Sequence, residues 1–283
     1  MLNRRTTGSI VCPSCGSLVG VGDDACYSCG RANPGLWGFG PVLRRLGADF
    51  GFVPLVVGGS TLLYLLTLVA SGSGLTVMRD VFSILSPSLD ALVRFGASGS
   101  VPFFGMGAWW TVLSASWLHG SLLHILFNMM WVRDLGPATA NVIGPARTVV
   151  IYTIAGACGF ILSSAVGRLD VSLPFLRGAS YTVGASASIF GLLGALVHYG
   201  RKSGSSLIHA EAKRYAIILF AMGLLMPGVS IDNFAHAGGF VGGYATSVFF
   251  NPLTRERGDH MLLAIGCLAA TALAILTSIA RSL

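Results

Sequence analysis

Charged side chains are scarce in this sequence. Asp, Glu, Lys and Arg make up 10% of its 283 residues, whereas about 25% is usual for a soluble domain. Hydrophobic residues make up 53% and the mean hydropathy is +0.74, so we expect a polytopic membrane protein. The net charge of +7 does not indicate a nucleic-acid partner, because the Lys and Arg residues are scattered near the ends of predicted helices, where they orient a membrane protein.

The amino terminus also lacks the apolar run of a secretory signal. Met1–Ser9 contains no such run, so no cleavable signal peptide is expected. Cysteine is scarce beyond the first thirty residues, where only Cys158 and Cys267 occur. Both lie inside apolar stretches, and we interpret them as small apolar residues of membrane helices.

The other four cysteines form two close pairs near the amino terminus. Cys12 and Cys15, then Cys26 and Cys29, give the pattern C-x2-C-x10-C-x2-C, and a glycine follows each pair. Paired thiolates on tight turns can share one tetrahedral ion, and Zn²⁺ suits four sulfur ligands. The pattern resembles a zinc ribbon with a structural metal, and two disulfides are the alternative. Reduced thiolates favour a cytoplasmic location, where this module would serve regulation or bind a cytoplasmic partner.

Seven apolar stretches are candidates for membrane-spanning helices, each of which needs about 20 mostly apolar residues. They cover residues 52–71, 117–136, 147–167, 184–200, 213–229, 235–251 and 260–280. His198, His209 and His260 fall at their cytoplasmic ends, where solvated or interfacial positions are expected.

The basic residues predict the orientation of these spans. Most of the 18 Lys and Arg residues fall in stretches that face the cytoplasm if the amino terminus does. We therefore expect a multi-pass protein of a bacterial cytoplasmic membrane, with the second, fourth and sixth spans all beginning at the outer side. The long segment Gly72–Ser116, which contains Phe103, Phe104, Trp109 and Trp110, is expected to lie in the outer interface.

Polar side chains lie near the start of the second span. His124 and Asn128 are four residues apart and share one helix face. Polar groups inside a span are costly and usually functional, although a structural contact between helices is the alternative. His119 does not share that face, and we expect it at the junction of loop and helix with a structural hydrogen bond.

A small-residue stretch, Gly184–Val197, carries hydroxyl groups at the start of the fourth span. We interpret Ser186 as a nucleophile. Ser188 is the fallback, but two residues along a helix point about 200° apart, so both cannot face the same base. The similar Gly96–Gly99 is interpreted as a decoy, because no long apolar helix follows it directly.

The sixth span offers a base for Ser186. His236, Gly239 and Gly243 lie on one face, and glycines let a partner helix approach closely. A neutral imidazole can take the proton of a serine hydroxyl near pH 7. No carboxylate clearly orients His236, and Asp232 is expected to cap the helix rather than to orient the imidazole. The matching small face of the fourth span consists of Ala187, Gly191 and Gly194.

These residues together resemble the rhomboid intramembrane serine proteases. The matching motifs are H-x4-H-x3-N from His119 to Asn128, G-x-S at Gly184–Ser186, and A-H-x-x-G-x-x-x-G from Ala235 to Gly243. The resemblance implies a six-helix core, a dyad of Ser186 and His236, and no catalytic cofactor. It also implies an oxyanion pocket formed by the side chains of His124 and Asn128 and the backbone N–H of Ser186.

Three positions depart from the family pattern. Ala187 stands where the family commonly has Gly, and Phe190 where it often has Tyr. The ring of Phe190 can still stack on His236. Thr111 follows Trp110 where a Trp-Arg pair is frequent, so this loop is expected to be held differently.

The sequence thus predicts an all-α polytopic membrane protein that cleaves transmembrane segments of membrane-protein substrates within the lipid bilayer. The alternatives are a catalytically inactive rhomboid-like binding module, which would be expected to lose Ser186 or His236, and a transporter with a polar pathway. The predicted parts are a zinc-ribbon-like four-cysteine module (residues 1–36), a linker (37–50), a six-helix rhomboid core (51–251) and a seventh, C-terminal transmembrane helix (252–283).

Overall fold

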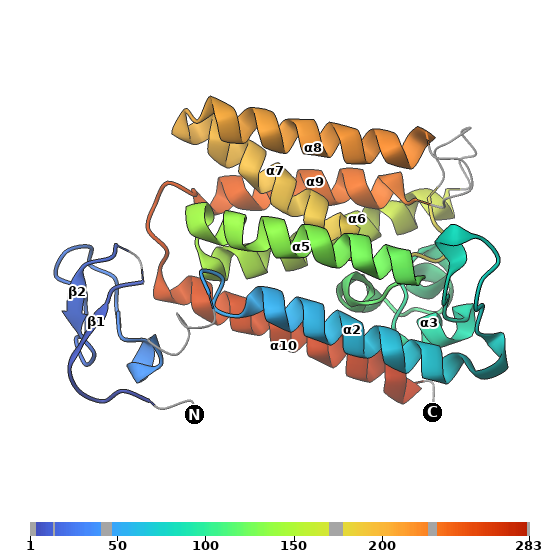
Figure 1. Cartoon of the computed structure of the whole chain (residues 1–283), viewed down its shortest axis with the longest axis horizontal. Coiled ribbons are helices and arrows are strands. Elements are labelled where there is room, and N and C mark those ends of the chain that lie inside the picture. The colour runs from blue at the N-terminus through green and yellow to red at the C-terminus, as the bar shows by residue number, and fades with distance from the viewer. Residues whose placement is uncertain (1–3, 14, 41–46, 170–177, 226–230, 282–283) are drawn as a thin grey trace.

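The computed structural model describes residues 4–13, 15–40, 47–169, 178–225 and 231–281, so residues 41–46 of the predicted linker lie outside the description. A two-stranded antiparallel sheet of β1 (Ser9–Val11) and β2 (Leu18–Gly20) stands at one end of a helical bundle (Figure 1). The long helices are α2 (Phe52–Ser71), α5 (Leu122–Ile143), α6 (Pro145–Arg168), α7 (Ser186–Ser203), α8 (Ser206–Leu225), α9 (Asn233–Phe250) and α10 (Gly258–Arg281).

Each predicted span corresponds to one of these long helices, although several ends differ. α8 begins at Ser206 instead of residue 213, and residues 226–229 of that predicted span lie outside the described residues. α5 begins at Leu122 instead of residue 117 and continues past Pro137 to Ile143. Its start is fixed by Ser121, whose hydroxyl accepts the backbone N–H of His124 at 3.3 Å. A local cap of this kind is not visible in the hydropathy of the sequence.

Among the described residues, three helices are long and apolar enough to cross a membrane by length and composition alone: Phe52–Gly74, Pro145–Arg168 and Gly258–Arg281. The other long helices include α7, which is less apolar because it lies inside the protein. α7 contacts α5, α6, α8 and α9, and nearly all of its residues from Ala187 to His198 are buried. Figure 1 shows α7 crossing between α8 and the helices behind it.

Glycines bring α7 and α9 into backbone contact. A Cβ on Gly243 would clash with the carbonyl oxygen of Gly191, and a Cβ on Gly239 would clash with that of Ala187. Gly194 likewise faces the backbone of Phe240. The predicted small-residue faces of these two helices therefore do meet. This close packing sets the distance between the α7 and α9 backbones, and so the distance between the side chains that face each other across them.

Short helices fold the segment between α2 and α5, which the sequence predicts only as an interfacial loop. At the end of the bundle opposite the strands, α3 lies beside the end of α2 (Figure 1). Trp109 and Phe104 are exposed in this segment. The elements are η2 (Gly72–Gly74), η3 (Val81–Ser83), α3 (Leu89–Phe95), η4 (Val101–Gly105), α4 (Thr111–Ser114) and η5 (Ala115–Trp117).

The four-cysteine module contacts the loop between α9 and α10. The side chain of Arg31 is buried, and its Nη1 donates to the carbonyl oxygen of Glu256 at 3.3 Å. In return, Nη1 of Arg255 donates to the carbonyl oxygen of Ser28 at 3.4 Å. The Glu256 carboxylate accepts the backbone N–H of Arg147 at 2.9 Å, which connects the module to the start of α6.

Arg147 is the fully buried centre of this contact. Its Nε donates to Nδ1 of His260 at 3.1 Å, and its Nη atoms donate to the carbonyl oxygens of Thr254 at 2.7 Å and Arg255 at 2.8 Å. The expectation of a solvated or interfacial His260 is therefore wrong, because the imidazole is needed as an acceptor inside the protein. His198 is likewise buried and lies 2.9 Å from the hydroxyl of Ser247.

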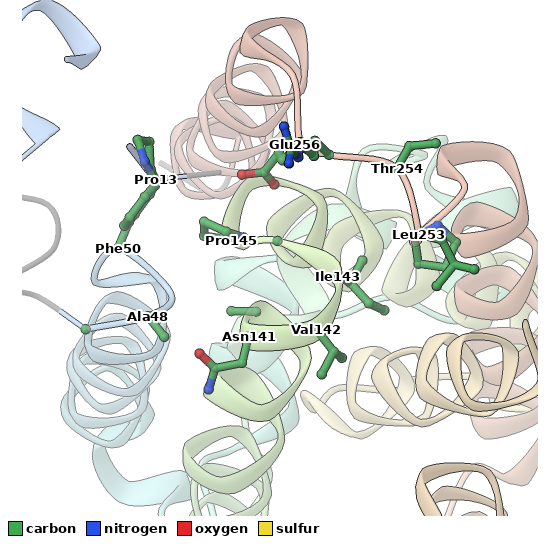
Figure 2. Close-up of a pocket in the computed structure, with 15 residues that line it drawn as sticks. Pro13, Ala48, Phe50, Asn141, Val142, Ile143, Pro145, Leu253, Thr254 and Glu256 are labelled. Carbon is green, nitrogen blue, oxygen red and sulfur yellow. The ribbon is translucent and has the colours of Figure 1, made fainter. Parts of the chain in front are cut away.

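A hollow lies beside this contact. It is bounded by Pro13, the segment just before α2, the turn between α5 and α6 and the α9–α10 loop. Figure 2 shows Phe50, Ile143 and Leu253 around it, with the Glu256 carboxylate at its edge. Ile143 is the last residue of α5 and His124 is near its start. The hollow is therefore at the opposite end of the bundle from the predicted oxyanion residues.

Candidate active site

Ser186 is the first residue of α7 and is half-buried. The turn before it needs a glycine, because Gly184 has φ +131° and a Cβ there would lie 2.6 Å from Nε2 of His124. The backbone N–H of Gly184 donates to the carbonyl oxygen of Ala115 at 2.9 Å. No side chain caps α7 at Ala185, and the first N–H groups of a helix have no partner within it. The serine hydroxyl therefore stands beside backbone donors.

His236 lies one turn into α9 and faces Ser186. Its Nε2 is 2.9 Å from the Ser186 Oγ, across 50 residues of sequence. The start of α9 is held by Asp232, whose carboxylate accepts the backbone N–H of Ala235 at 2.9 Å. This is the predicted helix cap. The Nδ1 of His236 is buried without a hydrogen-bond partner in the described part of the chain, so no described carboxylate orients the ring.

The ring of Phe190 stacks on a face of the His236 imidazole, as predicted. The two ring centres are 4.2 Å apart and the planes differ by 15°. Phe190 is one turn after Ser186 on α7, so one helix positions both the hydroxyl and the ring that restrains the imidazole of His236. The stack needs only the ring, which Phe and Tyr share.

His124 and Asn128 project from the first two turns of α5. The Nδ1 of His124 accepts the backbone N–H of Gly120 at 3.3 Å, so in a neutral ring the proton resides on Nε2. That Nε2 is the atom beside Gly184, next to Ser186. The side-chain amide of Asn128 uses one N–H to bond the carbonyl oxygen of His124 at 2.8 Å, and an amide nitrogen has two N–H groups. Both side chains thus carry donors on the side of α5 that holds the site.

Three other predicted residues lie away from the pair of Ser186 and His236. His119 is fully buried at the predicted junction before α5, and its ring lies edge-on to that of His124 with ring centres 5.2 Å apart. The expected structural hydrogen bond of its ring is wrong for the described residues, because neither ring nitrogen has a hydrogen-bond partner among them. The hydroxyl of Ser188 is buried and donates to Ser116 Oγ at 3.3 Å. Ser98, from the decoy motif, is fully buried and its backbone pairs with that of Thr182.

Sequence reasoning missed two contacts that support the site. The hydroxyl of Ser163 on α6 donates to the Asp232 carboxylate at 2.5 Å and accepts the backbone N–H of Ala179 at 3.1 Å. The other is the carbonyl oxygen of Ala115, which receives the N–H of Gly184. For Ser163, the available signal in the sequence was a hydroxyl side chain inside an apolar stretch. A backbone carbonyl has no sequence signal at all.

Comparison with known proteins bears directly on this arrangement. A model of the Rhomboid domain family matches residues 106–252, which is more than half of the chain and contains both Ser186 and His236. The chain belongs to the rhomboid family. Together with its apolar helices, this makes it an integral membrane protein with a rhomboid core and a further helix, α10, at its carboxyl end.

Several proteins resemble this rhomboid chain. RHOMBOID-like protein 7 of Arabidopsis thaliana is 33% identical over 169 residues, which are 57% of this chain and 49% of that protein. Rhomboid protease GluP of Bacillus subtilis (strain 168) is 30% identical over 182 residues, 64% of this chain and 34% of that protein. Putative rhomboid protease YdcA of the same bacterium is 32% identical over 143 residues, 50% of this chain and 67% of that protein.

The rhomboid chain thus spans only about a third to a half of the first two of these relatives. One of them comes from a plant and the other from a bacterium, so the prediction of a bacterial membrane stays a prediction.

The four cysteines outside the rhomboid core fit a metal. Their sulfur atoms all lie within 4.8 Å of one another, with Cys12 and Cys29 at 3.7 Å and Cys15 and Cys26 at 3.6 Å. In a tetrahedral site with Zn–S bonds of about 2.3 Å, two sulfur atoms are about 3.8 Å apart, which is close to both distances. Both are far longer than the S–S bond of a disulfide, which is about 2.05 Å. A hydrogen bond from the Ser17 side chain lowers the pKa of the Cys15 thiol to about 6, which favours the thiolate that binds metals.

Proposed function

We propose that this rhomboid protein is an intramembrane serine endopeptidase that hydrolyses a peptide bond in transmembrane segments of membrane proteins. The observation that carries the proposal is the 2.9 Å separation of the Ser186 Oγ and the His236 Nε2 at the start of α7. A nucleophile and a base within hydrogen-bond reach are the first requirement of covalent acyl transfer. The protease names of the Bacillus relatives support the same reaction class.

The reaction would proceed through an acyl-enzyme. The Ser186 Oγ attacks the carbonyl carbon of the scissile bond while Nε2 of His236 takes the hydroxyl proton. The tetrahedral adduct collapses by breaking the C–N bond, and the leaving amine receives that proton from His236. A water molecule, deprotonated by the same Nε2, then attacks the ester carbon. The bond between that carbon and the Ser186 Oγ breaks, the new carboxyl terminus is released, and His236 returns the proton to Ser186.

The developing negative charge on the substrate oxygen needs donors that are already in place. The Nε2–H of His124, the second amide N–H of Asn128 and the backbone N–H of Ser186 are the groups proposed for this purpose. Donors aimed at an oxyanion in a site without bulk water are worth about 3 kcal/mol each. His119 would support this set by its edge contact with His124.

The expected substrate is a transmembrane helix that unwinds locally. A helix in lipid keeps its backbone hydrogen bonds, so the scissile carbonyl becomes accessible only where small residues, Gly or Pro weaken the helix. With the amino terminus in the cytoplasm, the site lies at the outer side, where water can enter. The four-cysteine module would then hold a structural zinc ion on the cytoplasmic side through Cys12, Cys15, Cys26 and Cys29.

Covalent labelling with a fluorophosphonate tests the proposed nucleophile. We expect the wild-type protein and Ser188→Ala to be labelled, and Ser186→Ala to remain unlabelled. Ser188→Ala is a matched control, because it removes a buried hydroxyl only two residues away that bonds Ser116 instead of His236. Absence of labelling in the wild type would contradict the proposal and favour a rhomboid-like binding protein. Labelling that survives Ser186→Ala would contradict the assignment of Ser186 as the nucleophile.

A comparison of membrane-protein fragments in cells that express the wild type or Ser186→Ala would then identify substrates. Fragments that depend on Ser186 are expected to end within or next to a transmembrane segment.

A further inference from the structure

The carboxyl-terminal end of α10 makes specific polar contacts with the segment that precedes the site. The indole Nε1–H of Trp110 donates to the hydroxyl oxygen of Ser278 at 3.0 Å, across 168 residues of sequence. The Ser278 hydroxyl itself donates to the carbonyl oxygen of Ala274 at 2.9 Å, which leaves its lone pair directed at the indole. The guanidinium carbon of Arg281 lies 4.5 Å from the centre of the Trp110 ring.

A short path leads from Trp110 to the candidate nucleophile. Trp110 is the residue before α4, and α4 runs directly into η5, which starts at Ala115. The carbonyl oxygen of Ala115 accepts the N–H of Gly184 at 2.9 Å, two residues before Ser186. The segment from Trp110 through α4 therefore leads directly to a carbonyl oxygen that holds the turn before α7.

A second contact couples α10 to α4. The hydroxyl of Ser114, the last residue of α4, donates to the carbonyl oxygen of Gly96 at 2.7 Å. A Cβ on Gly96 would lie 2.8 Å from the hydroxyl of Ser278 and would also clash with that of Ser114. Ser278 thus bonds Trp110 directly, and its hydroxyl also lies close to Gly96, whose carbonyl oxygen accepts from Ser114 of α4.

The opposite end of α10 is also held within the protein. His260 on its first turn accepts from the buried Arg147 at the start of α6. Between these two ends, most side chains of α10 are exposed on the surface of the protein, and only 22% of its most hydrophobic stretch is buried. The helix is therefore held by polar contacts at both ends and, between them, by one buried face that includes Ala264, Thr271 and Ala274.

We propose that Ser278 and Arg281 are positioning residues for the reaction proposed above. They hold Trp110, and through α4 they hold the Ala115 carbonyl oxygen that receives the N–H of Gly184. The seventh helix would thereby form part of the catalytic unit instead of being an appended span. It would also supply the support for Trp110 in a chain that has Thr111 in the next position.

The test measures the acylation of Ser186 by a fluorophosphonate in a single turnover, together with kcat and KM for a transmembrane substrate. Loss of one hydrogen bond is worth about 1 kcal/mol, so Ser278→Ala and Trp110→Phe should each slow acylation about fivefold. Both should lower kcat with little change in KM. Ser278→Thr keeps a hydroxyl that can make the same bonds and should restore most of the rate.

Thr271→Val is the matched control. Thr271 lies two turns earlier on the same helix, and its buried hydroxyl donates only to the carbonyl oxygen of Cys267 among the bonds described. An equal loss of rate in Thr271→Val and Ser278→Ala would show a general effect on α10 and overturn the proposal. Arg281→Gln changes an exposed side chain, removes the cation beside the Trp110 ring and should also slow acylation.

Hydrogen exchange supplies a readout that does not depend on activity. In the Ser186→Ala background, Ser278→Ala should speed exchange in the segment that contains the Gly184 amide, whereas Thr271→Val should not. If the wild type is inactive but Ser278→Ala still speeds this exchange, the proposed function is contradicted while the positioning of Gly184 is supported. Unchanged exchange together with wild-type acylation in Ser278→Ala, Trp110→Phe and Arg281→Gln would overturn the positioning role.

Discussion

The phenyl ring of Phe190 lies flat against the imidazole of His236, with 4.2 Å between ring centres and 15° between planes. This contact restrains the ring whose Nε2 lies 2.9 Å from the Ser186 Oγ. The imidazole has no described partner at Nδ1, so the stack takes over the orientation that a carboxylate provides in a catalytic triad.

The first prediction concerns this stack. Aromatic pairs are worth about 0.5–1.5 kcal/mol beyond their burial, so Phe190→Leu should slow the labelling of Ser186 by roughly two- to tenfold. Phe190→Tyr keeps the ring and should stay near the wild-type rate. Labelling rates that are equal in Phe190→Leu and the wild type would show that the stack does not orient His236.

The second prediction concerns the backbone contact of α7 and α9. A methyl group on Gly243 would meet the backbone of Gly191, which cannot move aside as a flexible side chain can. Overpacking of this kind costs about 1–3 kcal/mol, so Gly243→Ala should lower the thermal stability in detergent and abolish labelling of Ser186. Gly266→Ala on α10 is the control, because a Cβ there meets nothing within 4 Å. The idea fails if the two variants melt at the same temperature.

The third prediction concerns the four-cysteine module. Purified protein should contain one zinc ion per chain by elemental analysis, and Cys15→Ser should lose it. Cys267→Ser, which removes a thiol from α10, should keep the metal. Removal of zinc by a chelator should expose the first forty residues to protease while the labelling of Ser186 persists. Metal-free protein with disulfide-linked cysteines would overturn the assignment.

The fourth prediction concerns Arg147. Its removal takes the donor away from several acceptors on the α9–α10 loop, including the carbonyl oxygens of Thr254 and Arg255. Breaking a buried charged contact costs about 3–5 kcal/mol, so Arg147→Ala should greatly lower the melting temperature. Arg214→Ala breaks an exposed pair with Glu211 and should cost less than about 1 kcal/mol. Comparable losses in the two variants would mean that the buried cluster is not a stabilising one.

The fifth prediction concerns pH. Burial, and then the charge of His124, lowers the pKa of His119 well below its ordinary value of 6.5. The unfolded chain therefore gains a proton near pH 6.5 that the folded protein does not, so stability is fully present above pH 6.5 and is lost as the pH falls. The loss is at most about 1.4 kcal/mol per pH unit. Melting temperatures measured between about pH 7.5 and 5.5 should fall less in His119→Asn than in the wild type, and parallel curves would contradict this.

Much of the architecture could be predicted because a lipid bilayer restricts the length and composition of the helices that cross it. A span needs about 20 apolar residues, and the seven predicted stretches correspond to the long helices from α2 to α10. Errors arose where local or tertiary contacts replaced hydropathy. The Ser121 cap moved the start of α5, and the acceptor requirement of Arg147 buried His260, which hydropathy alone places at the interface.

The sequence by itself determined the helical membrane class, the four-cysteine cluster and a short set of polar candidates, because these depend on composition and on spacing within one helix. Only the tertiary structure decided which candidates meet. It places Ser186 and not Ser188 against His236, through glycine contacts between two helices that lie 50 residues apart in sequence. It also places Ser278 beside Trp110 across 168 residues. Such distances follow from the packing of whole helices, and local periodicity carries no information about them.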